Sequence, residues 1–206
     1  MMWIMDIVGI AMFMYIVWRG LKDDYDGIGV VALGWLMILA FFVGGKLMGL
    51  VLTGLSQGFE WKGWVSVPFE PLGGWFLSVG VASWWAWVNN WKVSQLGEDV
   101  IGAVVGLMVW FEVKRLFISF DWKQVVLVLE MIIALIIAAW LGKRYRSIGW
   151  YRSGKKGFIF FFLGFLVLEL LAVAEMIMGG RAWLVSVEAI SGLLFLLGLI
   201  MLGREQ

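Results

Sequence analysis

The stretch from Ile28 to Leu55 carries a single charged residue, Lys46, in an otherwise apolar run. A helix of about 20 apolar residues crosses the hydrocarbon core of a bilayer, so this run is long enough to span a membrane. A lysine at that depth costs at least about 2.5 kcal/mol. We therefore expect the ammonium group to face protein, trapped water or an anionic partner. Alternatively, Lys46 lies off-centre and extends its ammonium group to the interface.

Three glycines, Gly44, Gly45 and Gly49, lie next to Lys46 in the sequence. Glycines remove side chains from a helix surface, so a neighbouring backbone or a lipid headgroup can approach closely. The pattern leaves two interpretations open: the glycines contribute to a binding site around Lys46, or they serve only the packing of helices.

The whole chain of 206 residues is 63% hydrophobic, whereas a soluble domain is nearer 45–50% apolar. This composition predicts an all-α, polytopic membrane protein that forms one domain over residues 1–206. Fifteen tryptophans suit the aromatic belts of membrane interfaces. Seven apolar runs are expected to be transmembrane helices, the first of them retained rather than cleaved as a signal: Met1–Trp18, Ile28–Leu55, Leu72–Trp91, Val100–Val113, Gln124–Leu141, Gly157–Met178 and Ala182–Leu202.

The distribution of Lys and Arg predicts the orientation of these runs. The loops after the first, third and fifth runs, together with the C-terminus, hold ten cations, against five on the opposite side. Because cytoplasmic loops carry an excess of Lys and Arg, we expect an outside N-terminus and a cytoplasmic C-terminus. The strongest cluster, residues 142–156, includes Arg152. It either binds anionic lipid headgroups or serves only to set the topology.

The residue types that are missing limit the chemistry. The chain has no Cys and no His, which removes thiol catalysis, disulfides and the commonest general base and metal ligand. We expect neither a metal nor a cofactor. A net charge of +1 without a basic block argues against nucleic acid as a partner.

Ionisable residues within apolar runs are the candidate functional residues, because such groups normally face the bundle interior and pair with one another. One interpretation is a polar cavity with Lys46 as its cation and Glu130 and Glu169 as its carboxylates. The alternative is structural: pairs of opposite charge at helix ends, and one glutamate that locks Lys46 between two helices. The end pairs would be Glu112–Arg115 and Glu175–Arg181, with Glu188 also near the end of its run.

Several motifs follow one another in a distinctive order: Phe42–Leu47 with two glycines before Lys46, Leu72–Ser78 with two glycines near its start, Gln124–Glu130, and the basic pair that opens Lys155–Phe158. In this order they resemble the bacterial prolipoprotein diacylglyceryl transferases, which are seven-span enzymes of the inner membrane. Lys46 occupies the position of an arginine of that family, and Ser78 occupies the position of a histidine. Glu169 falls near the family's glutamate.

The sequence departs from the family's pattern at two further places. Val167 falls near an essential arginine of the family. Gly106–Phe111 occupies the place of the Gly-Arg-x-Gly-Asn-Phe signature but has neither its arginine nor its asparagine.

The resemblance implies that a diacylglyceryl group is transferred from phosphatidylglycerol to the cysteine thiol of a lipoprotein precursor in the bacterial inner membrane. A basic group would hold the phosphate and a general base would take the thiol proton. Glu130, Glu169 and Ser78 are then the candidate catalytic residues. The candidate substrate-binding residues are Lys46, Gly44, Gly45, Gly73, Gly74 and Arg152.

Two other functions remain open from the sequence. A member of the family that has lost catalysis would act as a lipid-binding or scaffold protein of the membrane. A small-solute transporter is the third possibility, although the chain lacks the paired halves that inverted repeats leave.

Overall fold

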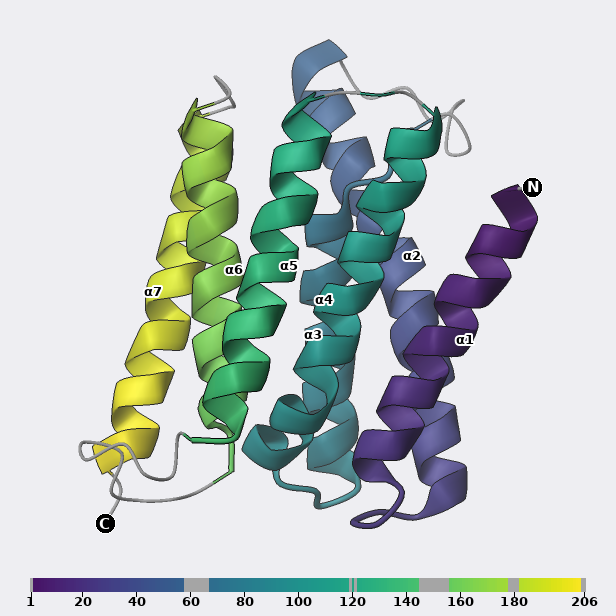
Figure 1. The fold of residues 1–206 in the computed structure, drawn as a ribbon, viewed down its shortest axis with the longest axis vertical. Helices are drawn as coiled ribbons and strands as arrows, with labels where there is room; N and C mark the ends of the chain where they lie inside the picture. The colour runs from purple at the N-terminus through teal and green to yellow at the C-terminus, as the bar shows by residue number, and fades with distance from the viewer. Residues whose placement is uncertain are drawn as a thin grey trace. The chain divides into compact units, whose positions relative to one another are not determined.

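The computed structural model describes residues 2–57, 67–118, 120, 122–144, 156–177 and 182–204. Within them every regular element is an α-helix, so the all-α prediction is confirmed, and each of the seven predicted runs overlaps one of seven helices (Figure 1). The helices are α1 (Met2–Leu21), α2 (Gly27–Gln57), α3 (Pro71–Val88), α4 (Val93–Ile118), α5 (Trp122–Gly142), α6 (Phe158–Ile177) and α7 (Ala182–Arg204).

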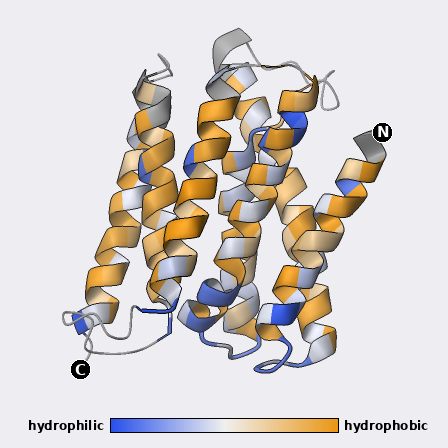
Figure 2. Cartoon of the chain, viewed as in Figure 1, coloured by the Kyte–Doolittle hydropathy of each residue, from blue (hydrophilic) through white to orange (hydrophobic). Residues whose placement is uncertain are grey.

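Four of these helices are long and apolar enough to cross a membrane: α1, α2, α5 and α7. In α6, a shorter apolar stretch covers Phe158–Val173. Hydrophobic residues run along the helices, while hydrophilic ones gather at their ends and in the turns (Figure 2). These helices indicate a multi-pass membrane protein, and the count of seven spans stays a prediction.

The chain divides into two compact units, residues 1–96 and 97–206. The division falls near the start of α4, so α1 to α3 belong to the first unit and α5 to α7 to the second. The single transmembrane domain expected from the sequence stays a prediction.

In the first unit, local hydrogen bonds fix where the helices begin and end. The Asp26 carboxylate accepts a bond of 2.9 Å from the Gly29 amide and so caps the first turn of α2. Pro71 occupies the first turn of α3. A backbone N–H there would have no acceptor within the helix, so proline loses no hydrogen bond at this position. Asn89 ends α3, since both its amide and its side chain donate to the Trp85 carbonyl, at 3.0 and 2.9 Å.

The helix α4 starts at Val93, whereas the predicted run starts at Val100, so most of the polar segment Lys92–Asp99 lies within the helix. The Leu96 amide donates to the Lys92 carbonyl at 2.9 Å, which closes a helical turn there. Helical backbone geometry therefore continues through Glu98 and Asp99, and the polarity of this segment marks a helix end rather than a loop.

In the first unit α2 and α3 form the most extensive helix pair, and it is antiparallel. Gly44 of α2 faces Gly73 of α3, with no side chain between the two backbones. At the neighbouring Gly74, an added Cβ atom would lie 2.6 Å from the Phe41 carbonyl oxygen. The backbones approach so closely that only hydrogen atoms fit at these positions.

The α6–α7 hairpin dominates the second unit, and its glycines receive side chains instead of backbone. Phe195 of α7 fills the space over Gly164 of α6, and Phe161 of α6 fills the space over Gly198 of α7. The Phe195 ring also lies 5.3 Å from the Phe160 ring, measured between centroids. Aromatic rings seated over glycines hold these two helices together.

Replacing Gly74 by alanine should therefore destabilise the α2–α3 pair, because the new methyl group would collide with the Phe41 carbonyl. We expect the free energy of unfolding, measured by denaturant titration in mixed micelles, to fall by about 1–3 kcal/mol. Gly80→Ala is the matched control on the same helix, since a Cβ atom there meets nothing within 4 Å. Alanine should there be neutral or stabilising by up to about 1 kcal/mol. Equal losses at both positions would contradict the packing described.

Candidate functional site

Lys46 lies within the apolar stretch of α2 and is partly buried. It follows Gly27, the first residue of α2, by 19 residues, or roughly 28 Å at about 1.5 Å per residue. That distance is close to the thickness of a hydrocarbon core of about 30 Å. If α2 starts at one interface, Lys46 therefore lies near the other.

The ammonium group of Lys46 donates a hydrogen bond of 2.7 Å to the carbonyl oxygen of Val67. Val67 opens a short non-helical segment, Val67–Glu70, that leads into α3 and that we call the strap. This acceptor is thus a backbone group of the strap.

The strap lies on the glycine surface of α2. Gly45 is covered by the Phe69 ring and Gly49 by the Pro68 carbonyl. The Glu70 amide donates to the Gly45 carbonyl at 3.0 Å. The glycines on both sides of Lys46 therefore make room for the strap.

Aromatic packing holds the strap in place as well. The Phe69 ring lies 5.4 Å from Phe41 and 6.0 Å from Phe42, measured between ring centroids. The strap is thus fixed to α2 by two hydrogen bonds, one through Lys46 and one through Gly45, and by a cluster of three rings.

All four glycines predicted to bind substrate face protein atoms in this structure. Gly45 faces the strap, while Gly44, Gly73 and Gly74 lie where α2 and α3 meet. The packing interpretation accounts for their positions, and their role in binding a substrate stays a prediction.

Ser78, a candidate catalytic residue, lies one turn beyond Gly74 on α3. Its side chain is 1% exposed, and its hydroxyl donates a 2.9 Å hydrogen bond to the Met37 carbonyl of α2. The hydroxyl therefore extends the α2–α3 contact that the glycines begin.

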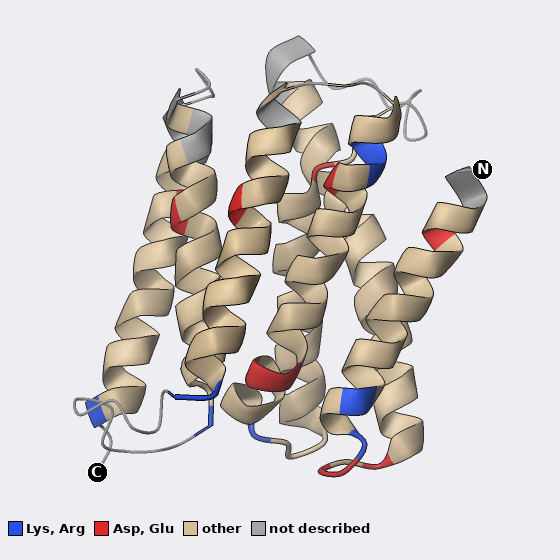
Figure 3. Cartoon of the chain, in the orientation of Figure 1, with Lys and Arg blue, Asp and Glu red and all other residues tan. Residues whose placement is uncertain are grey.

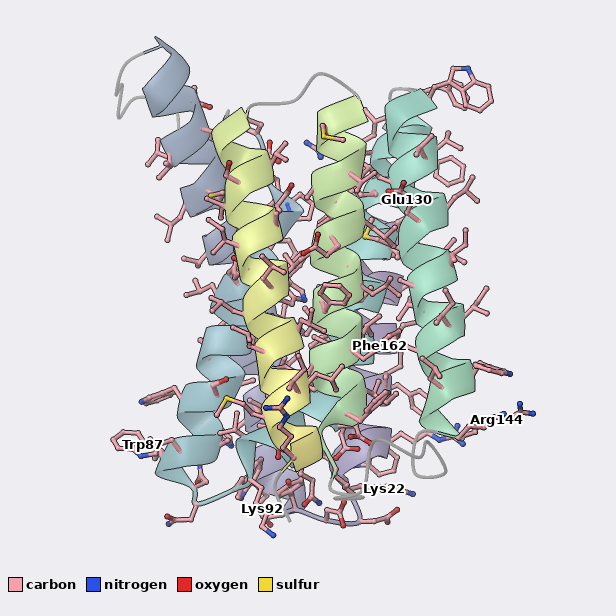
Figure 4. The ribbon with its side chains drawn as sticks, turned by 90° about the vertical axis from the view of Figure 1, so that its left-hand side faces the viewer. Lys22, Trp87, Lys92, Glu130, Arg144 and Phe162 are labelled. Carbon is pink, nitrogen blue, oxygen red and sulfur yellow. The ribbon has the colours of Figure 1, made fainter. Side chains whose placement is uncertain are left out.

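The two candidate carboxylates belong to the second unit. Glu169 of α6 places its carboxylate over Gly192 of α7, where an added Cβ atom would lie 2.5 Å from Oε1. Glu130 lies on α5, in the half of the helix away from Arg144 (Figure 4). Each has one buried carboxylate oxygen without a hydrogen-bond partner among the described residues: Oε1 in Glu169 and Oε2 in Glu130.

Thus Lys46, Ser78 and the four glycines belong to the first unit, while Glu130 and Glu169 belong to the second. A cavity that joins Lys46 to either carboxylate stays a prediction. Arg152 and Arg181 lie outside the described residues, and so does the side chain of Glu175.

Two other glutamates considered from the sequence lie where the structural alternative explains them. Glu112 pairs with Arg115 at 3.1 Å, as the structural alternative expected. Glu188 is buried on α7, one helical turn before Gly192. Charged residues of the described part gather near helix ends, with acidic residues of the second unit among the exceptions (Figure 3).

Sequence analysis missed the roles of the Val67 carbonyl and of Glu98. The Glu98 carboxylate accepts a hydrogen bond from the amide of Gly157 just before α6. Gly157 has a φ of 122°, a conformation that favours glycine. A glycine that follows a basic loop and precedes an apolar run was the available signal for a chain reversal there, but nothing in the sequence pointed to Glu98 as its partner.

Comparison of the chain with family models, curated proteins and solved structures gives no match. The fold and site therefore define a class only, an all-helical protein with several membrane-spanning candidates and one lysine within such a helix. The resemblance to the diacylglyceryl transferases stays a prediction drawn from the motifs.

Replacing Ser78 by alanine should lower the free energy of unfolding by about 0.6 kcal/mol and by no more than about 1.7 kcal/mol, as for other hydrogen bonds between membrane helices. The reason is loss of the bond to the Met37 carbonyl. Ser83→Ala on the same helix is the control. Denaturant titration measures both. A Ser78→Ala protein of unchanged stability would show that this bond contributes nothing to the α2–α3 contact.

Proposed function

We propose that the chain is a multi-pass protein of the bacterial inner membrane that binds the headgroup of an anionic phospholipid at Lys46. The resemblance to the diacylglyceryl transferases suggests phosphatidylglycerol as this lipid. The observation that carries the proposal is the ammonium group of Lys46, which lies within an apolar helix and is oriented by the Val67 carbonyl of the strap.

The chemistry of the ammonium group supports a phosphate ligand. The Val67 carbonyl that accepts from the Lys46 ammonium group is a neutral group. A phosphate diester would bring a full negative charge, which adds a Coulomb attraction to the ammonium group that a neutral carbonyl does not provide. Near the end of the hydrocarbon layer, where the length of α2 puts Lys46, lipid phosphates are within reach.

In the transfer that the resemblance implies, the thiol sulfur of the precursor would attack the glyceryl carbon that carries the phosphate ester. A carbon–sulfur bond would form, the carbon–oxygen bond to the phosphate would break, and glycerol phosphate would leave. Lys46 would stabilise the phosphate charge, and Glu130 or Glu169 would take the thiol proton. This assignment of roles rests on the resemblance.

A lipid-binding protein without catalysis is the second candidate, and two observations favour it. The hydroxyl of Ser78, at the place of the family's histidine, donates into the α2–α3 packing. Val167, near the place of the family's essential arginine, is 1% exposed and lies in the apolar core. The buried, apolar side chain of Val167 cannot hold a phosphate as the arginine would.

Lys46→Met should weaken binding of phosphatidylglycerol at this site by about tenfold, since a charge-assisted hydrogen bond contributes about 1.5–3 kcal/mol. Lys46→Arg keeps the charge and should retain most of the binding. Titration of the purified protein in neutral micelles with a fluorescent phosphatidylglycerol measures both variants. Equal affinities in wild type and Lys46→Met would contradict the proposal.

Transfer is tested separately with phosphatidylglycerol and a peptide that carries the cysteine of a lipoprotein precursor. Mass spectrometry would show a peptide enlarged by the diacylglyceryl group if the chain is a transferase. A family enzyme assayed in parallel is the positive control. Lipid binding through Lys46 without any lipidated peptide would select the non-catalytic candidate.

The predicted topology can be measured on its own, because the chain has no cysteine. Single cysteines at Asp23 and Asn90, in the turns after α1 and α3, should react with a membrane-impermeant maleimide only from the cytoplasmic side. A cysteine at the exposed Phe120, between α4 and α5, should react only from the outside. Reaction of positions 23 and 120 from the same side would contradict the seven-span arrangement.

A further inference from the structure

The C-terminal end of α1 carries two pairs of an aromatic residue and a cation, each four residues apart. The Lys22 ammonium lies over the Trp18 ring, 4.9 Å from its centroid. The Arg19 guanidinium donates to the Tyr15 hydroxyl at 3.3 Å. All four side chains are exposed, and Trp18 is 43% exposed. Residues four apart share a helix face, so each cation lies one turn closer to the middle of the helix than its own Cα.

The same arrangement recurs in the second unit at the C-terminal end of α5. The Arg144 guanidinium lies over the Trp140 ring, 5.0 Å from its centroid, and Trp140 is 56% exposed. Both α1 and α5 are helices long and apolar enough to span a membrane. Two helices of different units thus end with an exposed tryptophan and a cation held over its ring.

This geometry differs from the usual behaviour of a cation near the end of a membrane helix. Lysine and arginine there normally extend their charge away from the hydrocarbon and into water. Here the attraction between cation and ring holds the charge at the depth of a tryptophan, which is the depth of the lipid headgroups. The negatively charged group that a bilayer presents at that depth is a lipid phosphate.

The carboxylates that are close to Lys22 in the sequence leave its ammonium group open to a lipid phosphate. Asp24 accepts a 3.2 Å hydrogen bond from Gln95, and Asp26 caps α2. Asp23 is exposed in the turn and follows Lys22 directly. Two of the three acids are thus bonded to groups other than Lys22.

We propose that the Trp18–Lys22 and Trp140–Arg144 pairs each bind the phosphate of an anionic phospholipid in the cytoplasmic leaflet. The cation supplies the charge and the ring sets its depth. Both pairs lie at the C-terminal ends of odd-numbered helices. The distribution of Lys and Arg predicts that these ends face the cytoplasm. These contacts are separate from Lys46 and do not depend on the function proposed for it.

The chain offers a matched control for each cation. Lys92 is exposed at the same end of the first unit as Lys22, because Tyr25 and Trp91 join their turns with ring centroids 4.2 Å apart. Lys143 is exposed and adjacent to Arg144. Within the described residues neither Lys92 nor Lys143 lies over a ring, and Figure 4 shows the positions of Lys22, Lys92 and Arg144.

The experiment incorporates the full chain into nanodiscs of phosphatidylglycerol and phosphatidylcholine in equal amounts. Mild detergent extraction and native mass spectrometry then give the ratio of the two lipids retained on the protein. Lys22→Gln with Arg144→Gln should lower the retained phosphatidylglycerol about fivefold at each site. Lys92→Gln with Lys143→Gln should change it by less than about twofold.

Two further variants separate lipid binding from a role in capping the helices. Trp18→Leu with Trp140→Leu keeps both charges but removes the rings, and should also lower retention. The exchange of Lys22 for Arg and of Arg144 for Lys should preserve it. Circular dichroism verifies that each variant is folded.

Three outcomes would overturn the proposal: equal losses in the control pair and the ring-paired cations, no loss on removal of the rings, or no preference of the wild type for phosphatidylglycerol. Lys46→Met in the same assay separates the two proposals, since it should remove lipid at Lys46 only. Loss of lipid in Lys46→Met alone would uphold the proposed function and reject this inference. Loss of lipid in the Lys22 and Arg144 variants alone would uphold this inference and reject the proposed function.

Discussion

The close approach of α2 and α3 is the contact on which the first unit depends. Inside a membrane, apolar side chains gain little by leaving lipid for protein, so helices associate through tight packing and hydrogen bonds between them. The glycines of α2 and α3 bring the two backbones together, and the buried hydroxyl of Ser78 adds a hydrogen bond across the same contact. The position of Lys46 follows from this arrangement, because the strap that leads into α3 passes over the glycines beside it.

The helices of the second unit also associate through tight packing at glycines, but the groups that contact these glycines differ. The glycines of α6 and α7 accept phenylalanine rings and, at Gly192, the carboxylate of Glu169. A glycine that faces a side chain tolerates small shifts of that side chain, whereas one that faces backbone does not. At Gly44 and Gly74 the α2–α3 pair therefore depends on contact with backbone, whereas the α6–α7 pair depends on side chains that fit over glycines.

The helices could be predicted from the sequence, while the contacts of the candidate site could not. Long apolar runs leave the helix as the form that satisfies its own backbone groups, and each predicted run overlaps a helix. The acceptor for Lys46 was not predictable, because every residue has a carbonyl and the sequence does not distinguish that of Val67. The glycines near Lys46 signalled a close approach but not its partner. Likewise, the contact between Glu98 and Gly157 joins residues that are far apart in the sequence.

The acceptor for Lys46 has one consequence for how this chain can be dissected. Because the ammonium group bonds to a main-chain oxygen, a scan that exchanges side chains at position 67 leaves the acceptor in place. Chemical synthesis that replaces the peptide link between Val67 and Pro68 by an ester would weaken that oxygen as an acceptor without altering any side chain. This contact of the lysine is thus encoded by the path of the chain rather than by the identity of a residue.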